Sequence, residues 1–239
     1  MRRRYAPVVT ARPVLLVHGF ASSFERNWRE PGWVDILVES GRTVIELDLP
    51  GHGTAEKSHD PDFYADMPAV VASAIPEGQV VDAIGFSMGA GLLLEVAAAQ
   101  PERFGRVVVA GVGTNLFQAG DSEPAALAIE RGSAGDGDHP ATQAFSVFAR
   151  AEGNDPLALA ACMRRRRPPL QAADLARLTR PVLVVLGTKD FVGPADPLLD
   201  ALPDARLVEL SGADHFGTPK DFRFIEAAVA FLEEGDTLA

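Results

Sequence analysis

The chain has 239 residues, of which 47% are hydrophobic and 23% are charged, and its formal net charge is −11. This length and composition are typical of one globular domain, with or without a small insertion. The acidic balance disfavours nucleic acid and anionic membranes as partners, because both are themselves negatively charged. No stretch approaches the roughly 18 apolar residues of a membrane span, and no apolar segment of a secretory signal follows the basic residues 1–4. Cys162 is the single cysteine, so we expect no internal disulfide and a cytoplasmic location.

Short apolar runs alternate with helical patterns along most of the chain. The runs are rich in Val, Leu and Ile and predict buried strands at residues 13–17, 42–47, 80–86, 106–110, 181–186 and 205–210. Helical patterns lie at residues 33–40, 62–75 (with a break or late start near Pro68), 88–100 and 221–234. This alternation predicts an α/β fold with a doubly wound, mostly parallel sheet that helices cover on both faces.

One segment interrupts the alternation. Residues 114–173 contain no convincing strand, but they can form short helices at 125–131, 141–150 and 156–167, with a glycine-rich loop at 132–138. A stretch of about sixty residues is too long for a plain loop. We therefore predict a helical cap at 114–173, inserted into a core that consists of residues 1–113 and 174–239.

Ser87 is the candidate nucleophile. It lies in the pattern Gly-x-Ser-x-Gly at residues 85–89, directly after a predicted strand and directly before a predicted helix. A sharp turn of this kind exposes the serine, and the helix N-terminus beneath it supplies N–H groups and a positive dipole end. The alternative is a glycine-rich turn in which the serine only caps the helix.

Two backbone N–H groups are candidates for an oxyanion hole, which acyl transfer requires. One belongs to Met88, immediately after the candidate nucleophile. The other belongs to Phe20, in the loop that follows the first predicted strand. We expect the neighbouring His18 to shape this loop through hydrogen bonds to the backbone and to take no part in proton transfer.

His215 is the candidate general base, and Asp190 is the candidate for its orienting acid. His215 follows the last predicted strand and Asp190 follows the strand before it, and parallel strands all end at the edge where Ser87 lies. The remaining histidines are expected to be structural or solvated: His18, His52, His59 and His139. Asp214 is adjacent to His215 and is expected to point elsewhere. The other place for an acid, residues 111–115, contains none.

Five motifs appear in the order typical of one family: HGF at 18–20, DLPGHG at 48–53, GFSMG at 85–89, GTKD at 187–190 and GADHF at 212–216. From residue 14 to residue 231 the chain therefore resembles the α/β-hydrolases. The resemblance implies an eight-stranded, mostly parallel sheet with a variable cap. The chain departs from this pattern at its start, where about a dozen residues precede the first strand, so we expect the opening antiparallel hairpin to be missing or shortened.

Apolar side chains near the predicted cap are candidates for a substrate pocket, although aromatic residues at helical spacing can equally belong to the core. The candidates are Phe24, Phe117, Phe145, Phe148, Phe191 and Val192. The arginines at 164–167 are expected to form a solvated face, with a carboxylate-binding arginine as the alternative. No motif indicates a metal or a phosphate-binding loop, so we expect no metal and no cofactor.

The sequence predicts a serine-dependent hydrolase that cleaves esters, or related acyl bonds, of small to medium, largely apolar molecules. One alternative is a carbon–carbon bond hydrolase of dienone acids with the same three residues, which an arginine from 164–167 near the pocket would favour. Another is a non-catalytic ligand receptor built on a hydrolase scaffold. A haloalkane dehalogenase is disfavoured because it needs Asp where Ser87 stands. We expect a small-molecule substrate as the partner, and no feature of the sequence indicates the oligomeric state.

Overall fold

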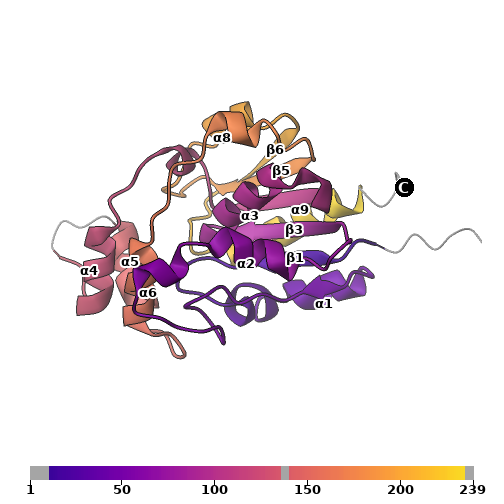
Figure 1. The fold of residues 1–239 in the computed structure, drawn as a ribbon. Coiled ribbons are helices and arrows are strands. Elements are labelled where there is room, and N and C mark those ends of the chain that lie inside the picture. The colour runs from indigo at the N-terminus through magenta and orange to yellow at the C-terminus, as the bar shows by residue number, and fades with distance from the viewer. Residues whose placement is uncertain (1–10, 136–139, 235–239) are drawn as a thin grey trace, which may run out of the picture.

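We describe a computed structural model of the chain over residues 11–135 and 140–234 (Figure 1). His139, part of the predicted glycine-rich loop and the basic residues at the N-terminus lie outside these ranges.

A single sheet of parallel strands forms the centre of the described fold. Its strands are β1 (Val14–Val17), β2 (Val44–Ile45), β3 (Val81–Phe86), β4 (Phe104–Ala110), β5 (Val182–Gly187) and β6 (Ala205–Leu210), in the order β2-β1-β3-β4-β5-β6. Every neighbouring pair is parallel. The predicted parallel α/β sheet is confirmed, and the described part of the chain contains six strands where the resemblance implies eight.

The position of a strand in the sheet explains its residues. β1, β3 and β5 are inner strands and are buried along their whole length, which accounts for their nearly continuous apolar runs. β6 is an edge strand, and half of its residues are exposed. The other edge strand, β2, is shorter than predicted. The Arg42 side chain, expected in that strand, instead turns inward and forms a buried 2.7 Å ion pair with Asp82 of β3.

Helices cover both faces of the sheet. One face carries α2 (Met67–Ala74), α3 (Met88–Ala99), α7 (Ala172–Leu175) and α8 (Asp196–Ala201), together with the 3₁₀ turns η2 (Pro61–Tyr64), η3 (Pro101–Arg103) and η4 (Thr114–Phe117). The other face carries α1 (Trp33–Glu39), α9 (Phe222–Glu233), the π-helical turn η1 (Glu25–Arg29) and the 3₁₀ turn η5 (Thr218–Lys220). The doubly wound arrangement is therefore confirmed.

The predicted helix at 62–75 is interrupted, as its proline suggested. The segment forms η2 first, and α2 then begins at Met67 with Pro68 in its first turn. The Asp66 side chain caps this start by accepting the Ala69 N–H. Proline is tolerated here because the first-turn N–H groups have no partner within the helix.

Between β4 and β5, the helix α4 (Glu123–Arg131) packs against both α5 (Pro140–Phe148) and α6 (Pro156–Arg164). We call them the cap helices. No described residue between 114 and 173 lies in a strand. A small separate core joins these helices and includes Ala21 from the loop after β1. Figure 1 shows the cap helices grouped beyond one end of the sheet.

Among the helices that the structure describes, none has both the length and the apolar character that a bilayer-spanning segment needs.

Candidate active site

Ser87 occupies the turn between β3 and α3. Its backbone has φ 51° and ψ −114°, a strained conformation for a residue with a side chain. The flanking glycines make this turn sterically feasible. A Cβ atom on Gly85 would lie 2.8 Å from the Cα atom of Ala90, and one on Gly89 would lie 2.4 Å from the Val17 carbonyl oxygen. The Gly-x-Ser-x-Gly pattern is thus explained by steric fit.

Ser87, His215 and Asp190 form one hydrogen-bonded chain. The Ser87 hydroxyl lies 2.9 Å from Nε2 of His215. The other ring nitrogen, Nδ1, lies 3.0 Å from each carboxylate oxygen of Asp190. Because an ionised carboxylate only accepts hydrogen bonds, Nδ1 carries the proton and Nε2 is left to accept from the hydroxyl. The alternative that Ser87 only caps α3 is wrong, because its side chain makes no capping hydrogen bond.

The neighbouring acid, Asp214, forms hydrogen bonds within the loop that follows β6. Its carboxylate accepts the Gly217 N–H at 2.8 Å, and its carbonyl accepts the Thr218 hydroxyl at 2.8 Å. These bonds shape the turn after β6 that presents His215. The structure therefore places Asp190, and not Asp214, against the imidazole.

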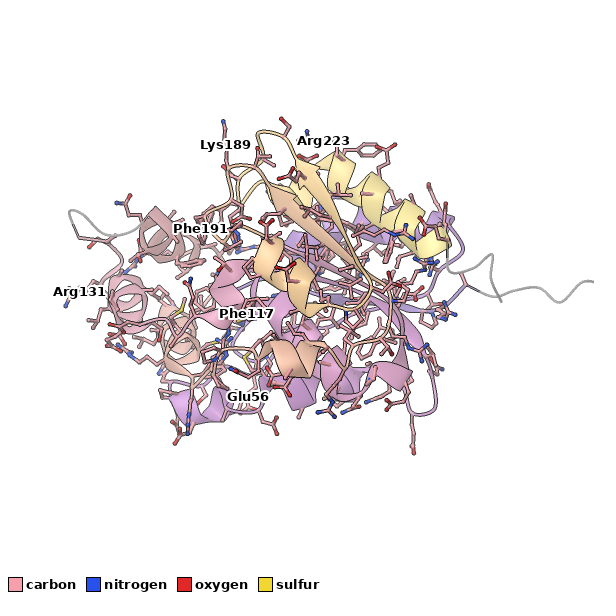
Figure 2. The ribbon with its side chains drawn as sticks, turned by 90° about the horizontal axis from the view of Figure 1, so that it is seen from above. Glu56, Phe117, Arg131, Lys189, Phe191 and Arg223 are labelled. Atoms are coloured by element: carbon pink, nitrogen blue, oxygen red, sulfur yellow. The ribbon has the colours of Figure 1, made fainter. Side chains whose placement is uncertain are left out.

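Aromatic rings surround the imidazole of His215. Ring centroids of Phe191, Phe86 and Phe216 lie 4.6, 5.1 and 5.2 Å from it. His215 is only 3% exposed and the Asp190 side chain is fully buried. Figure 2 shows Phe191 on the side of the core that faces the cap helices. This packing restricts the ring to the orientation that both hydrogen bonds require.

His18 holds the loop after β1 through its two ring nitrogens. Nε2 accepts the Leu49 N–H at 3.0 Å, so Nδ1 carries the proton and donates to the Gly19 carbonyl at 2.8 Å. Complete burial lowers the pKa of His18 and keeps it neutral, despite opposing contributions from Gly19 and Asp48. The Gly19 carbonyl shares a trans peptide plane with the Phe20 N–H, and the two groups point in opposite directions. His18 therefore fixes the direction of the Phe20 N–H, the structural role that its position predicted.

The N–H groups of Phe20 and Met88 make no hydrogen bond to any residue that the structure describes. Met88 is the first residue of α3, where an N–H has no partner within the helix. Both residues line the same cavity as Ser87 and His215. Both N–H groups are therefore candidates for an oxyanion hole beside Ser87.

Two cavities meet at Ser87. The first has a volume of about 320 Å³, and its lining combines five phenylalanines with the charged residues Arg26, Glu30 and Lys220. The second has a volume of about 190 Å³ and extends along the start of α3. Both are lined by Phe20, Ser87, Phe145 and His215.

Four of the six predicted pocket residues line these cavities. Phe145 lines both, Phe148 lines the first, and Phe191 and Val192 line the second.

Phe24 and Phe117 line neither cavity, which corrects the prediction for both. Phe24 is 4% exposed and packs in the core on the α9 face of the sheet, because η1 begins directly after it and turns it inward. Phe117 ends η4 and packs against the core on the α3 face. The prediction missed Phe86 and Phe216, which line the first cavity. Their adjacency to Ser87 and His215 in the sequence was the available signal.

The arginines at 164–167 do not form one solvated face. Arg164 pairs with Glu123 at 2.8 Å and also with Glu130, and so it links α6 to α4. Arg166 is exposed. Arg165 and Arg167 line the second cavity beside Ser87. Within the described ranges, no group of three or more His, Cys, Asp or Glu side chains is arranged to hold a metal ion.

Comparison with known proteins identifies the family. The family model of the alpha/beta hydrolases matches residues 14–230. The chain therefore belongs to the α/β hydrolase family of hydrolytic enzymes, and the resemblance drawn from its motifs is confirmed. The structure of a thermophilic esterase from Thermogutta terrifontis has a similar fold, with a TM-score of 0.71 and 21% identity over 95% of this chain and 91% of that one.

Curated relatives match only part of the chain. A 95-residue segment is 35% identical to the dihydrolipoyllysine-residue acetyltransferase component of the acetoin cleaving system of Cupriavidus necator, over 39% of this chain and 24% of that protein. A 110-residue segment is 31% identical to the 2-hydroxy-6-oxononadienedioate/2-hydroxy-6-oxononatrienedioate hydrolase of Escherichia coli K12, over 42% of this chain and 36% of that protein. The matches thus span 24% and 36% of these relatives' own lengths.

Proposed function

We propose that this chain is a serine hydrolase that cleaves esters of small to medium acyl groups through an acyl-enzyme. The observation that carries the proposal is the hydrogen-bonded chain of Ser87, His215 and Asp190, which opens onto two cavities. The arrangement has the three parts that acyl transfer needs: a nucleophile, a base held by an acid, and free backbone donors beside them.

The first half of the reaction forms the acyl-enzyme. Nε2 of His215 takes the hydroxyl proton as Ser87 Oγ attacks the ester carbonyl carbon. The carbonyl oxygen gains negative charge, which the Phe20 and Met88 N–H groups stabilise. Asp190 stabilises the imidazolium that forms. The tetrahedral intermediate then collapses, the bond to the alcohol oxygen breaks, and His215 returns the proton to the leaving alcohol.

The second half releases the acid. His215 removes a proton from water as the water oxygen attacks the acyl carbon. The same two N–H groups hold the second oxyanion, and the proton returns to Ser87 Oγ when the acyl bond breaks. His215 moves every proton in these steps, so the proposed reaction uses no cofactor. The cap, residues 114–173, would roof the pocket and limit the size of the substrate.

Hydrolysis of a carbon–carbon bond in a dienone acid is a second candidate. The partial similarity to the E. coli hydrolase named above favours it, and so does the position of Arg165 and Arg167 in the second cavity. The same three residues would serve either reaction, so the fold alone does not choose between them.

A turnover screen tests the proposal. Wild-type protein and Ser87→Ala are compared on short aryl esters, lactones, thioesters and dienone acids. We expect turnover of the esters by the wild type and a loss of roughly 10⁴-fold or more in the variant. Turnover of dienone acids with no turnover of esters would favour the second candidate. Equal activity of the two proteins would contradict both.

A further inference from the structure

The arginine run changes direction where α6 ends. The helix stops at Arg164, and Arg165 has φ −52° and ψ 142°, an extended conformation. Pro168 follows the run and disfavours helical backbone at Arg167. In extended backbone, side chains alternate between two sides, so residues two apart share a side. This explains why Arg165 and Arg167 both line the second cavity while Arg166 does not.

These two guanidinium groups lack carboxylate partners. Neither Arg165 nor Arg167 forms an ion pair within 4 Å in the described part of the chain. One nitrogen of Arg165, Nη1, donates to the Cys162 carbonyl at 3.0 Å. Desolvation by the surrounding protein and the adjacent charge of Arg165 lower the pKa of Arg167, although this residue is exposed, and Glu95 of α3 opposes the shift. Positive charge that is only partly offset therefore lies beside the reacting residues.

The rest of this cavity is mainly apolar. Asn115 is its other polar residue apart from Ser87 and His215, and its remaining lining consists of Phe20, Met88, Leu116, Phe145, Met163, Phe191 and Val192. A guanidinium suits such surroundings because it is more weakly hydrated than an ammonium and presents a planar fork that matches a carboxylate. A volume of about 190 Å³ admits only a short chain.

We infer that the second cavity is a carboxylate-binding subsite, so that the preferred substrate carries a carboxylate a few carbons from its scissile carbonyl. Arg165 and Arg167 bind the carboxylate, and the uncharged remainder of the substrate lies against the phenylalanines of the first cavity, whose lining also contains Arg26, Glu30 and Lys220. Glu95 offsets part of the arginine charge, which favours a singly charged group. The inference deepens the proposed function and rests on it for the turnover tests below, although not for the binding test.

Matched pairs of esters test the subsite. For a carboxylate on the acyl side, the pair is p-nitrophenyl hydrogen glutarate and its neutral terminal amide. For a carboxylate on the leaving side, the pair is 4-acetoxybutanoate and its amide. At low salt, we expect one of these acids to exceed its amide in kcat/KM by about 10-fold or more, which is the effect that one charge-assisted hydrogen bond produces. The ratio should be smaller at high salt, because salt screens the charges. Ratios near one in both pairs would overturn the inference.

Arginine variants identify the side chains that cause the preference for the acid over its amide. Arg165→Gln and Arg167→Gln should each reduce the ratio by about 10-fold, mainly by raising KM for the acid. Arg166→Gln is the matched control because this exposed residue lines neither cavity, and it should keep the full ratio. An equal loss in all three variants would show long-range attraction and no subsite, which would overturn the inference. Arg165 also bonds to Cys162, so Arg167→Gln and Arg165→Lys provide the evidence if Arg165→Gln does not fold.

A binding measurement separates this inference from the proposed function. Calorimetry on Ser87→Ala with glutarate needs no turnover. Binding that Arg167→Gln abolishes and Arg166→Gln retains supports the subsite even if no ester is cleaved. Turnover of neutral esters, with neither glutarate binding nor an acid preference, leaves the proposed function standing and refutes the subsite.

Discussion

Asn154 ties the segment between α5 and α6 to the carbonyl oxygen of Ala21, in the loop that carries the Phe20 N–H. The side-chain amide donates to Ala21 at 3.1 Å and to the Phe148 carbonyl at 3.0 Å. Ala21 has φ 56°, which is unfavourable for a residue other than glycine, and its side chain packs into the core of the cap helices. The cap segment thus holds a strained part of the loop in place.

Substitution of Asn154 by Asp tests this contact. The carboxylate keeps the size of the side chain but repels both carbonyl groups, so the loop should relax and misplace the Phe20 N–H. We expect kcat to fall about 10-fold, less than the 10²–10³ that complete loss of an oxyanion donor causes, with little change in KM. A boronic acid that mimics the tetrahedral intermediate should lose affinity by the same factor. Unchanged kcat would show that the contact does not position the loop.

Parallel Asp→Asn substitutions distinguish the roles of Asp190 and Asp214. Asp190→Asn should fold normally yet lose up to roughly 10⁴-fold in kcat, because an amide cannot stabilise the imidazolium and favours the other tautomer. Asp214→Asn keeps an oxygen for the Gly217 N–H and should retain most activity. Steady-state kinetics of the two proteins check this, and the reverse outcome would reassign the acid.

Gly89 and Gly91 provide a matched test of the turn at Ser87. A Cβ atom at Gly89 would lie 2.4 Å from the Val17 carbonyl oxygen, whereas one at Gly91 would make ordinary contact with Leu116 at 3.4 Å. Gly89→Ala should lower the free energy of unfolding by about 1–3 kcal/mol, and Gly91→Ala should leave it unchanged or raise it by up to about 1 kcal/mol. Urea unfolding measures both. Equal effects would contradict the steric account of the turn.

His52 should make the fold sensitive to acid. Burial lowers its pKa to about 3, with a further contribution from His18, and its Nε2 has no partner among the described groups. The unfolded chain then binds a proton near pH 6.5 that the folded chain does not bind until about pH 3, so the free energy of unfolding falls as pH decreases across this range. The decrease is at most about 1.4 kcal/mol per pH unit for this group. His52→Leu should show a flatter dependence in urea titrations at several pH values, and an unchanged slope would contradict the neutral state of His52.

The positions of the strands and the candidate triad were accessible from sequence because local signals specify them. Buried runs of branched apolar residues indicated the strands, and parallel strands bring the residues that follow them to one edge. Ser87 follows β3 directly, and Asp190 and His215 lie in the loops that follow β5 and β6.

Contacts between distant segments were not accessible in this way. Asn154 and Ala21 are 133 positions apart in the sequence, and no local sequence pattern predicts the hydrogen bond between them. Phe24 and Phe145 have equivalent apolar side chains, and only the direction of η1 sends the first into the core. The division of the arginine run depends on where α6 ends and on the acids that α4 supplies to Arg164.

Labelling with a fluorophosphonate tests the central claim most directly, because the reagent reacts with a serine that a neighbouring base activates. We predict one label per chain, located on Ser87 by peptide mapping, with labelling absent in Ser87→Ala and slowed at least roughly 10³-fold in His215→Ala. A wild-type protein that remains unlabelled, or a label on another serine, would contradict the assignment of Ser87 as the nucleophile.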